Sequence, residues 1–486
     1  MASVHELEKL QPLGRLEHVS ASCHHLGFFN VGVSAHYKLS ESSFPAPFYL
    51  RRLIFAAAGD VIRRHRILSA IPVGKDSPDT LFTSLQSVDL DRITTFLKRS
   101  HPPGGASGIE DKHLDAVHEE QHNTNFKSEY DTLPFWRLIV LQDIGLESGF
   151  TVSFIYHHAI GDGVSGLVFH NAFLDALGVA SYKCLFEYSI EGIIEPDENT
   201  SLLLPLEQLH PLPTNPVSPS PSATNLKEWT GCPIRTPCKS CWTSLCFSPG
   251  TSEAFFQECK EQGAPVTSAV SSILTTALSR ILPTTAEALT CIIPVSLHPW
   301  LKLPRNVTDS AIGTYINATR VQFTRASSKD IWAGARHASK AINDYLANVS
   351  PSGEPYTAVA VFKTISDVSL VFKSLFGKPR DAVFEVTNTG RFSASTTTRT
   401  ERFFRWQVGK VMFGRSSVVS GAVVTVSVGT GGGGSITVGI SWQEGVVEEE
   451  IMNKPTESFK KHFDQYQSEP GDATWVCVFF RLGVYI

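Results

Sequence analysis

A short apolar run that ends in two adjacent histidines constrains the fold more than any other stretch of the chain. The run covers residues 150–156, is rich in β-branched and aromatic residues, and has the length of a buried strand. Residues 164–174 then carry apolar residues at helical spacing. The sequence His157-His158-Ala159-Ile160-Gly161-Asp162-Gly163 is therefore predicted to form a tight turn between a core strand and a helix.

This turn is suited to acid–base chemistry. A strand end holds a side chain rigidly, and the partial positive charge at a helix start disfavours an imidazolium. A neutral, positioned imidazole is what a general base needs near neutral pH. Because neighbouring strand residues point to opposite faces, His157 and His158 are predicted to have different roles. Asp162 is predicted to fix the turn and neutralise a buried cation, and Gly163 to leave room beside the imidazole.

The other predicted elements favour a mixed α/β sandwich over an alternating strand–helix fold. The apolar strands at 422–428 and 436–442 are predicted to pair across the glycine-rich loop Gly431-Gly432-Gly433-Gly434-Ser435. A helix at 448–462 contains Pro455, which predicts a new start or a kink. Further strands are predicted at 26–39, 68–73, 136–141, 289–295, 313–321 and 383–388, and further helices at 50–62, 108–128, 267–278 and 331–346.

A proline-rich segment divides the chain. With 486 residues the chain exceeds one average core, so two domains are expected. Residues 206–225 contain five prolines in a Ser-, Thr- and Asn-rich context, which predicts an extended, exposed linker. The expected organisation is an N-terminal subdomain over 1–205, a linker over 206–228 and a C-terminal subdomain over 229–486.

Charge, cysteine usage and hydropathy narrow the protein class. A formal net charge of -5, with no basic stretch interleaved with aromatics, argues against a nucleic-acid-binding protein. Nine cysteines in a long chain favour free thiols. The N-terminus lacks a signal-peptide pattern, and no stretch reads as a transmembrane span. We expect a cytoplasmic monomer. The apolar tail at 473–486 is compatible either with a packed terminal strand or with peripheral contact with a membrane.

Two metal-like patterns offer alternatives. His118-Glu119-Glu120-Gln121-His122 has the HExxH spacing of zinc peptidases. Its surroundings are hydrophilic and no third ligand stands out, so a solvated helix is the preferred interpretation. The cysteines at 232, 238, 241 and 246 contain only one CxxC unit, and free thiols are preferred over structural zinc. No metal is expected to take part in the chemistry.

The His157–Gly163 sequence resembles the HHxxxDG motif of the CoA-dependent acyltransferase superfamily, which includes chloramphenicol acetyltransferase, the plant BAHD enzymes and the condensation domains of peptide synthetases. The surrounding sequence is similar to the fungal alcohol acetyltransferase family, and the similar segments follow in the same order from about Leu13 to about His462. The plant DFGWG motif is absent; the nearest text is Met412-Phe413-Gly414-Arg415-Ser416. The segments that carry the similarity are Leu133-Pro134-Phe135-Trp136-Arg137-Leu138, Pro294-Val295-Ser296-Leu297, Ile312-Gly313-Thr314-Tyr315, Thr387-Asn388-Thr389-Gly390 and Ser441-Trp442.

The resemblance implies an α/β fold with two chloramphenicol-acetyltransferase-like mixed-sheet domains and a tunnel between them. His158 matches the general base, and Asp162 matches an aspartate that orders the turn, usually by pairing with an arginine. Gly163 matches the residue that keeps the tunnel open, and His157 the less essential first histidine. Asn388, with Gly390, matches a strand on the opposite side, where a substrate contact is expected.

The implied activity is transfer of an acyl group, with acetyl expected, from acyl-CoA to an alcohol hydroxyl. Acetyl-CoA would be a co-substrate, and no cofactor would be bound permanently. The partners would be acyl-CoA and a small alcohol or amine. The alternatives are N-acetylation, another acyl-CoA-dependent transfer to a secondary metabolite, and a non-catalytic binding protein with the same fold.

Overall fold

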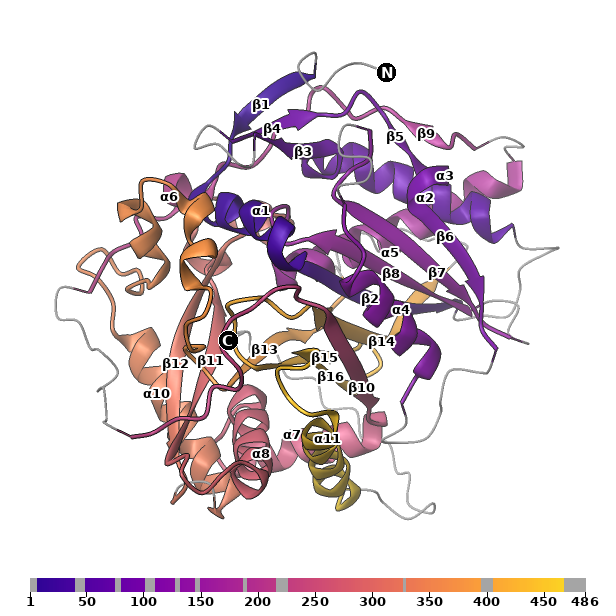
Figure 1. Ribbon diagram of the computed structural model, residues 1–486. Coiled ribbons are helices and arrows are strands. Elements are labelled where there is room, and N and C mark those ends of the chain that lie inside the picture. Colours follow the sequence, from indigo (N-terminus) through magenta and orange to yellow (C-terminus); the bar gives the residue numbers. More distant parts are fainter. Residues whose placement is uncertain are drawn as a thin grey trace.

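Two mixed β-sheets organise the described chain, which in this computed structural model comprises residues 7–39, 49–74, 80–100, 110–126, 132–144, 149–186, 190–215, 226–326, 329–394 and 405–466. The first has five strands in the order β14-β2-β8-β7-β6, and the second has six in the order β10-β16-β15-β13-β11-β12. Each has its own hydrophobic core. The sandwich of strands and helices expected from the sequence is confirmed (Figure 1).

The first sheet is built around β8 (Gly149–His157), whose residues are all buried. This strand pairs antiparallel with both of its neighbours, so the histidines at its end are held from two sides. The other strands are β2 (Asn30–Leu39), β7 (Trp136–Gln142), β6 (Thr94–Lys98) and β14 (Trp406–Arg415).

The second sheet mixes parallel and antiparallel pairs. β13 (Phe384–Arg391) runs parallel to both β11 (Ala288–Ser296) and β15 (Val424–Thr430). β15 and β16 (Ile436–Gln443) form the predicted hairpin across the glycine-rich loop, where Gly434 has φ 90°. The remaining strands are β10 (Ser240–Cys246) and β12 (Ile316–Thr324).

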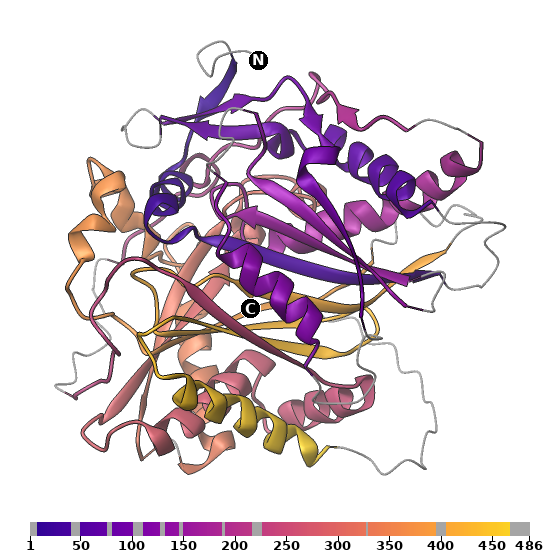
Figure 2. The ribbon, with the colours of Figure 1, turned by 45° about the vertical axis from the view of Figure 1, so that its right-hand side comes forward.

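Helices cover the sheets on their outer faces (Figures 1 and 2). α5 (Gly163–Phe186) packs against α2 (Leu50–Arg64), β2 and β14, whereas α8 (Val266–Ile281) packs against α10 (Ile331–Ala347) and α11 (Glu449–Asp464). The other helices are α1 (Arg15–Gly27), α3 (Leu90–Ile93), α4 (Lys112–His122), α6 (Leu206–Leu209), α7 (Pro249–Glu261) and α9 (Arg305–Thr308). The small strands are β1 (Glu8–Pro12), β3 (Ala70–Val73), β4 (Leu81–Ser84), β5 (Val88–Asp89) and β9 (Ile193–Ile194).

The two halves of the sequence are interlocked. β14 lies in the second half of the sequence, yet it pairs antiparallel with β2 at the edge of the first sheet. The division at 206–228 stays a prediction, but the C-terminal half contributes one strand to the N-terminal sheet. The expected exposure of the linker is wrong for 206–215: Leu206, Leu209 and Leu212 are buried against Leu297 and Tyr315. Residues 216–225 lie outside the described ranges.

Three other local predictions need correction. The strand expected from residue 26 starts only at Asn30, because α1 runs through Gly27 and a bend at Phe28 and Phe29 separates the two. α11 continues through Pro455 as one helix, so a new start there is wrong. The helix expected at 108–128 forms as α4 but is not exposed on all sides: His118 and His122 are fully buried, because this helix packs between β2 and β10.

The expectation that no stretch is apolar enough to span a bilayer also needs correction. Within α5, residues Gly163–Cys184 meet the length and composition of a spanning helix, with a mean hydropathy of 1.3 over the most apolar window. About half of that window, 56%, is buried inside the protein. α5 is apolar because it packs on both α2 and the first sheet, as core helices do. The tail at 473–486 lies outside the described residues.

Candidate active site

The turn that follows β8 places its two histidines in different surroundings, as the alternation of strand side chains predicts. His157 is fully buried, and its ring packs edge-on against Phe126 and Phe135 at centroid distances of 6.4 and 5.6 Å. Its Nδ1 accepts a hydrogen bond of 3.1 Å from the backbone N–H of Ala159. His158 instead lines a cavity. The structure therefore gives His157 a packing environment away from the cavity wall and His158 an accessible ring.

The cavity beside His158 has a volume of about 200 Å³. It lies between α1, the end of β14 and the segments that follow β14 and α10. Phe29, Thr314 and Arg415 join His158 in the wall. Most other lining side chains are apolar, including Leu16, Val19, Ile316, Phe372 and Val418. A small, largely apolar molecule fits such a space better than a highly charged one.

Backbone hydrogen bonds fix His158 to both halves of the sequence. Its N–H donates to the carbonyl of Phe29 at 3.0 Å, and its own carbonyl accepts from Thr314 Oγ1 at 2.9 Å. The Phe29 ring lies 4.5 Å from the imidazole, centroid to centroid. Phe28 and Phe29 have φ of 54° and 57°, a conformation that costs energy in residues other than glycine. The strained bend thus holds an aromatic wall against the imidazole.

The imidazole of His158 is neutral at physiological pH. Its pKa is lowered to about 4, chiefly by burial and then by the positive charge of Arg415. The carbonyl of the same residue acts in the opposite direction. Nδ1 is buried without a hydrogen-bond partner in the described part of the chain, so Nε2 is the ring nitrogen that a molecule in the cavity can reach. The ring can accept a proton at Nε2 from a molecule in the cavity.

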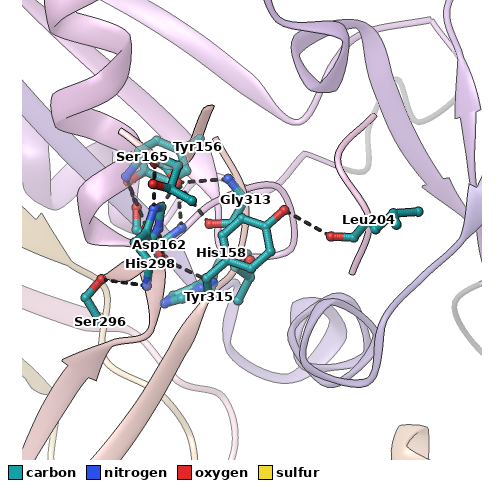
Figure 3. A network of polar contacts seen from close by, with 11 residues as sticks. Tyr156, His158, Asp162, Ser165, Leu204, Ser296, His298, Gly313 and Tyr315 are labelled. Carbon is teal, nitrogen blue, oxygen red and sulfur yellow. Dashed lines mark hydrogen bonds and ion pairs between the residues drawn. The ribbon is translucent and has the colours of Figure 1, made fainter. Parts of the chain in front are cut away.

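Asp162 lies at the centre of the polar network drawn in Figure 3. Its carboxylate accepts from the N–H and Oγ of Ser165, at 3.1 and 3.0 Å, and from the N–H of Tyr315 at 3.1 Å. It also pairs with His298 Nε2 at 3.1 Å. Its own N–H donates to the carbonyl of Gly313 at 3.0 Å. The carboxylate therefore points away from the cavity and ties the turn to the second half of the sequence.

The cation beside Asp162 is a histidine, where the family resemblance implied an arginine. Burial alone would raise the pKa of Asp162, but the charge of His298 and the donated hydrogen bonds hold it below its ordinary value. Burial would lower the pKa of His298, but the charge of Asp162 raises it above its ordinary value. The two groups thus stabilise each other as an ion pair shielded from water.

Gly163 and Asn388 lie on the side of the turn where α5 meets β13 and β14. A Cβ on Gly163 would be 3.1 Å from atoms of both Phe413 and Thr389, so a glycine allows these strands to approach the helix. Asn388 donates to Thr267 Oγ1 at 3.1 Å and accepts from the N–H of Gly390 at 2.8 Å. Neither residue lines the cavity beside His158.

The HExxH helix has a packing role. His118 Nε2 lies 2.8 Å from Ser34 Oγ, and its ring stacks on Trp242 at 5.0 Å. The ring of His122 meets Trp242 edge-on at 5.1 Å. Within the described ranges no three His, Cys, Asp or Glu side chains are grouped as metal ligands would be. The cysteines at 232, 238, 241 and 246 are not joined by disulfide bonds.

Three residues of the site escape a reading of the sequence alone. His298 follows directly on the Pro294-Val295-Ser296-Leu297 segment, which resembles the family. The resemblance thus drew attention to this part of the chain but not to the histidine itself. Arg415 lies in the text nearest to the absent plant motif. Phe29 had no signal, because an aromatic residue at the start of a strand is ordinarily core. All three reach the site through pairing of distant segments.

Comparison with known proteins identifies the family. A family model described as alcohol acetyltransferase matches residues 109–465. A "Probable alcohol acetyltransferase crmB" from Aspergillus fumigatus is 56% identical over 463 residues, covering 94% of this chain and 99% of that protein. The chain belongs to the alcohol acetyltransferase family. A second relative, "Probable alcohol acetyltransferase FCK4" from Fusarium pseudograminearum, is 21% identical and covers 61% of this chain and 63% of that one.

Solved structures identify the fold of this member of the alcohol acetyltransferase family. The TRI3 trichothecene 15-O-acetyltransferase from Fusarium sporotrichioides superposes with a TM-score of 0.68 at 13% identity, over 94% of this chain and 95% of the other. The first condensation domain of the calcium-dependent antibiotic synthetase superposes with a TM-score of 0.60 at 12% identity, over 95% and 98%. The fold is that of the chloramphenicol-acetyltransferase-like acyltransferases, as the resemblance implied.

Proposed function

We propose that the protein transfers an acetyl group from acetyl-CoA to the hydroxyl of a small alcohol, with His158 as general base. Membership of the alcohol acetyltransferase family supports acyl transfer. The observation that carries the role of His158 is its position: among the described residues it is the one imidazole in the wall of the apolar cavity, and its pKa of about 4 keeps the ring neutral. A base must lie within hydrogen-bond reach of the proton it removes.

In the proposed reaction the hydroxyl proton of the acceptor passes to His158 Nε2 as the oxygen attacks the thioester carbonyl carbon. The tetrahedral intermediate then collapses, its carbon–sulfur bond breaks, and the imidazolium returns the proton to the departing thiolate. Ester and free CoA are the products, and His158 ends neutral as it began. Base catalysis of this kind adds about 10²–10⁴-fold, and alignment of the two substrates adds more.

Asp162 is proposed as a positioning residue. It is held by His298, Ser165 and the Tyr315 N–H, all on the side of the turn away from the cavity. His157, Gly163 and Asn388 are proposed to act indirectly, by packing beneath the turn and by setting the approach of β13. A direct substrate contact of His157, Gly163 or Asn388 stays a prediction, as do a monomeric state and a cytoplasmic location.

The proposed function is tested by incubating the purified protein with acetyl-CoA and matched panels of small alcohols and amines. We expect acetyl esters of the mass of acceptor plus acetyl, release of one CoA thiol per ester, and slower transfer to longer acyl chains. Faster acetylation of the amines would replace O-transfer with N-transfer. Binding of acetyl-CoA without release of the CoA thiol in the presence of any acceptor would contradict an enzymatic role and favour a binding protein of the same fold.

A further inference from the structure

A buried cation forms part of the cavity wall, and the proposed reaction leaves it without a role. Arg415, the last residue of β14, is 7% exposed and lines the cavity together with His158. Among the described residues of the wall it is the only one with a positive charge at neutral pH. Burial of a charge is costly unless the group is paired, so its partners determine what it can still bind.

The guanidinium of Arg415 is partly satisfied by the protein. Its Nη2 contacts the carboxylate of Glu385 at 2.8 Å and Thr425 Oγ1 at 3.2 Å. The carbon of the guanidinium lies 5.5 Å from the centroid of the Phe29 ring. Its Nε is unpaired but enclosed by the protein, whereas its Nη1 makes no hydrogen bond within the described part of the chain and is not enclosed. An N–H donor of a buried cation thus remains available at the wall.

The pairing with Glu385 decides the class of ligand. The ion pair is neutral overall, so a second carboxylate at Arg415 would meet the repulsion of the first. A neutral oxygen, such as a carbonyl, accepts the free N–H without that repulsion. The rest of the wall is largely apolar, and about 200 Å³ is less than the roughly 300–1,000 Å³ of sites for drug-sized ligands.

We propose that Arg415 is a specificity-determining residue, whose guanidinium donates a hydrogen bond to a neutral carbonyl-type oxygen that a small acceptor alcohol carries close to its reacting hydroxyl. That this molecule accepts the acetyl group rests on the proposed function, whereas its binding beside Arg415 does not. An acceptor of this kind places its hydroxyl at His158 Nε2, its second oxygen at Arg415 and its apolar frame against Phe372 and Val418.

A purely structural role for the same residue makes a different prediction. The Arg415–Glu385 pair joins β14 of the first sheet to β13 of the second, so it could serve only to hold the sheets together. In that case substitution would lower stability and weaken the binding of all ligands alike. Recognition by Arg415 instead weakens only ligands that carry the second oxygen. The ratio between two matched ligands separates the roles.

The experiment compares an α-hydroxyketone with the alcohol in which a methyl-bearing carbon replaces its carbonyl. Dissociation constants are measured by saturation-transfer NMR on the full chain without acyl-CoA. Because hydrogen bonds to charged groups contribute about 1.5–3 kcal/mol, we expect the wild type to bind the hydroxyketone roughly 10- to 100-fold more tightly. The ratio should fall close to one in Arg415→Met combined with Glu385→Gln, which leaves no buried charge unpaired.

Two further variants make the result specific. Arg415→Lys keeps the positive charge but lacks the planar fork of guanidinium donors, so it should also lose the preference if the double variant does not fold. Arg320→Met removes an exposed arginine that is paired with Asp381, and the ratio should match the wild type. A wild-type ratio near one, or an unchanged ratio in folded Arg415 variants, would overturn the proposal. Selective binding without release of CoA would retain it and contradict the proposed function.

Discussion

The turn at His157–Gly163 and the helix α4 both bury two histidines beside an aspartate, yet only the turn presents one of its histidines to the cavity described above. His158 and His118 both have a pKa lowered to about 4 by burial. His118 Nε2 is already bonded to Ser34, and the stacked Trp242 covers its ring. His158 borders a cavity. A neutral imidazole is therefore not sufficient for catalysis; its lone pair must also be reachable by a substrate.

The aspartates of these two regions differ as well. Asp162 is ionised, because His298 and several donors offset the cost of burial. Asp115 on α4 accepts hydrogen bonds from Trp242 and Ser244, but burial still raises its pKa to about 7. The turn is thus organised by charge, whereas the Asp115 carboxyl on α4 is uncharged below about pH 7 and is held by hydrogen bonds. This contrast predicts opposite sensitivities to substitution.

The largest effect on stability is expected for Asp162→Asn. The substitution removes one partner of a buried ion pair and leaves His298 without its carboxylate, which costs about 3–5 kcal/mol of the free energy of unfolding. Asp115→Asn is the matched control, because an amide resembles the neutral carboxyl and keeps an acceptor for Trp242. Urea denaturation measures the free energy of unfolding of both variants. Equal losses in the two variants would remove the distinction between a charged turn and a neutral helix.

A smaller loss is expected where α5 begins. Gly163→Val places atoms against Phe413 and Thr389, and overpacking of this kind costs about 1–3 kcal/mol. Gly250→Val in the first turn of α7 is the control, since a Cβ there has no atom within 4 Å. Thermal unfolding compares them. Unaltered stability of Gly163→Val would mean that the strands can move away from the helix without cost.

The smallest effect is expected from pH between about 5 and 8. A base with a pKa near 4 is already unprotonated throughout that range, so kcat/KM should stay level and fall only as pH approaches 4. Circular dichroism at each pH separates this fall from unfolding. A fall centred near 6.5, the ordinary pKa of histidine, would indicate that His158 is solvated or that another histidine is the base.

The ion pair behind the turn has its own dependence on pH. The raised pKa of His298 gives stability that is present below about 6.5 and lost as pH rises through its folded value. The lowered pKa of Asp162 gives stability that is present above about 3.9 and lost as pH falls through its folded value. The pair is therefore most stabilising between about pH 3.9 and 6.5.

Local sequence patterns predicted the turn, but they did not predict the residues that contact it from distant parts of the chain. The strand, the turn and the helix that contains Gly163 are contiguous, so hydrophobic periodicity located them correctly. His298 reaches Asp162 from 136 residues further along the chain, and Arg415 arrives on a strand that crosses into the other sheet. No local pattern encodes such contacts. For the same reason α4 was predicted to be solvated, although β10 covers its histidines.

The measurement that tests the account most directly is the rate of acetyl transfer by His158→Ala beside His118→Asn, under single-turnover conditions with the same alcohol. We expect His158→Ala to remain folded and to lose about 10²–10⁴-fold in rate, the usual contribution of a general base. His118→Asn should stay within a few-fold of the wild type, because His118 does not line the cavity beside His158. An unchanged rate in folded His158→Ala would contradict the assignment of the base.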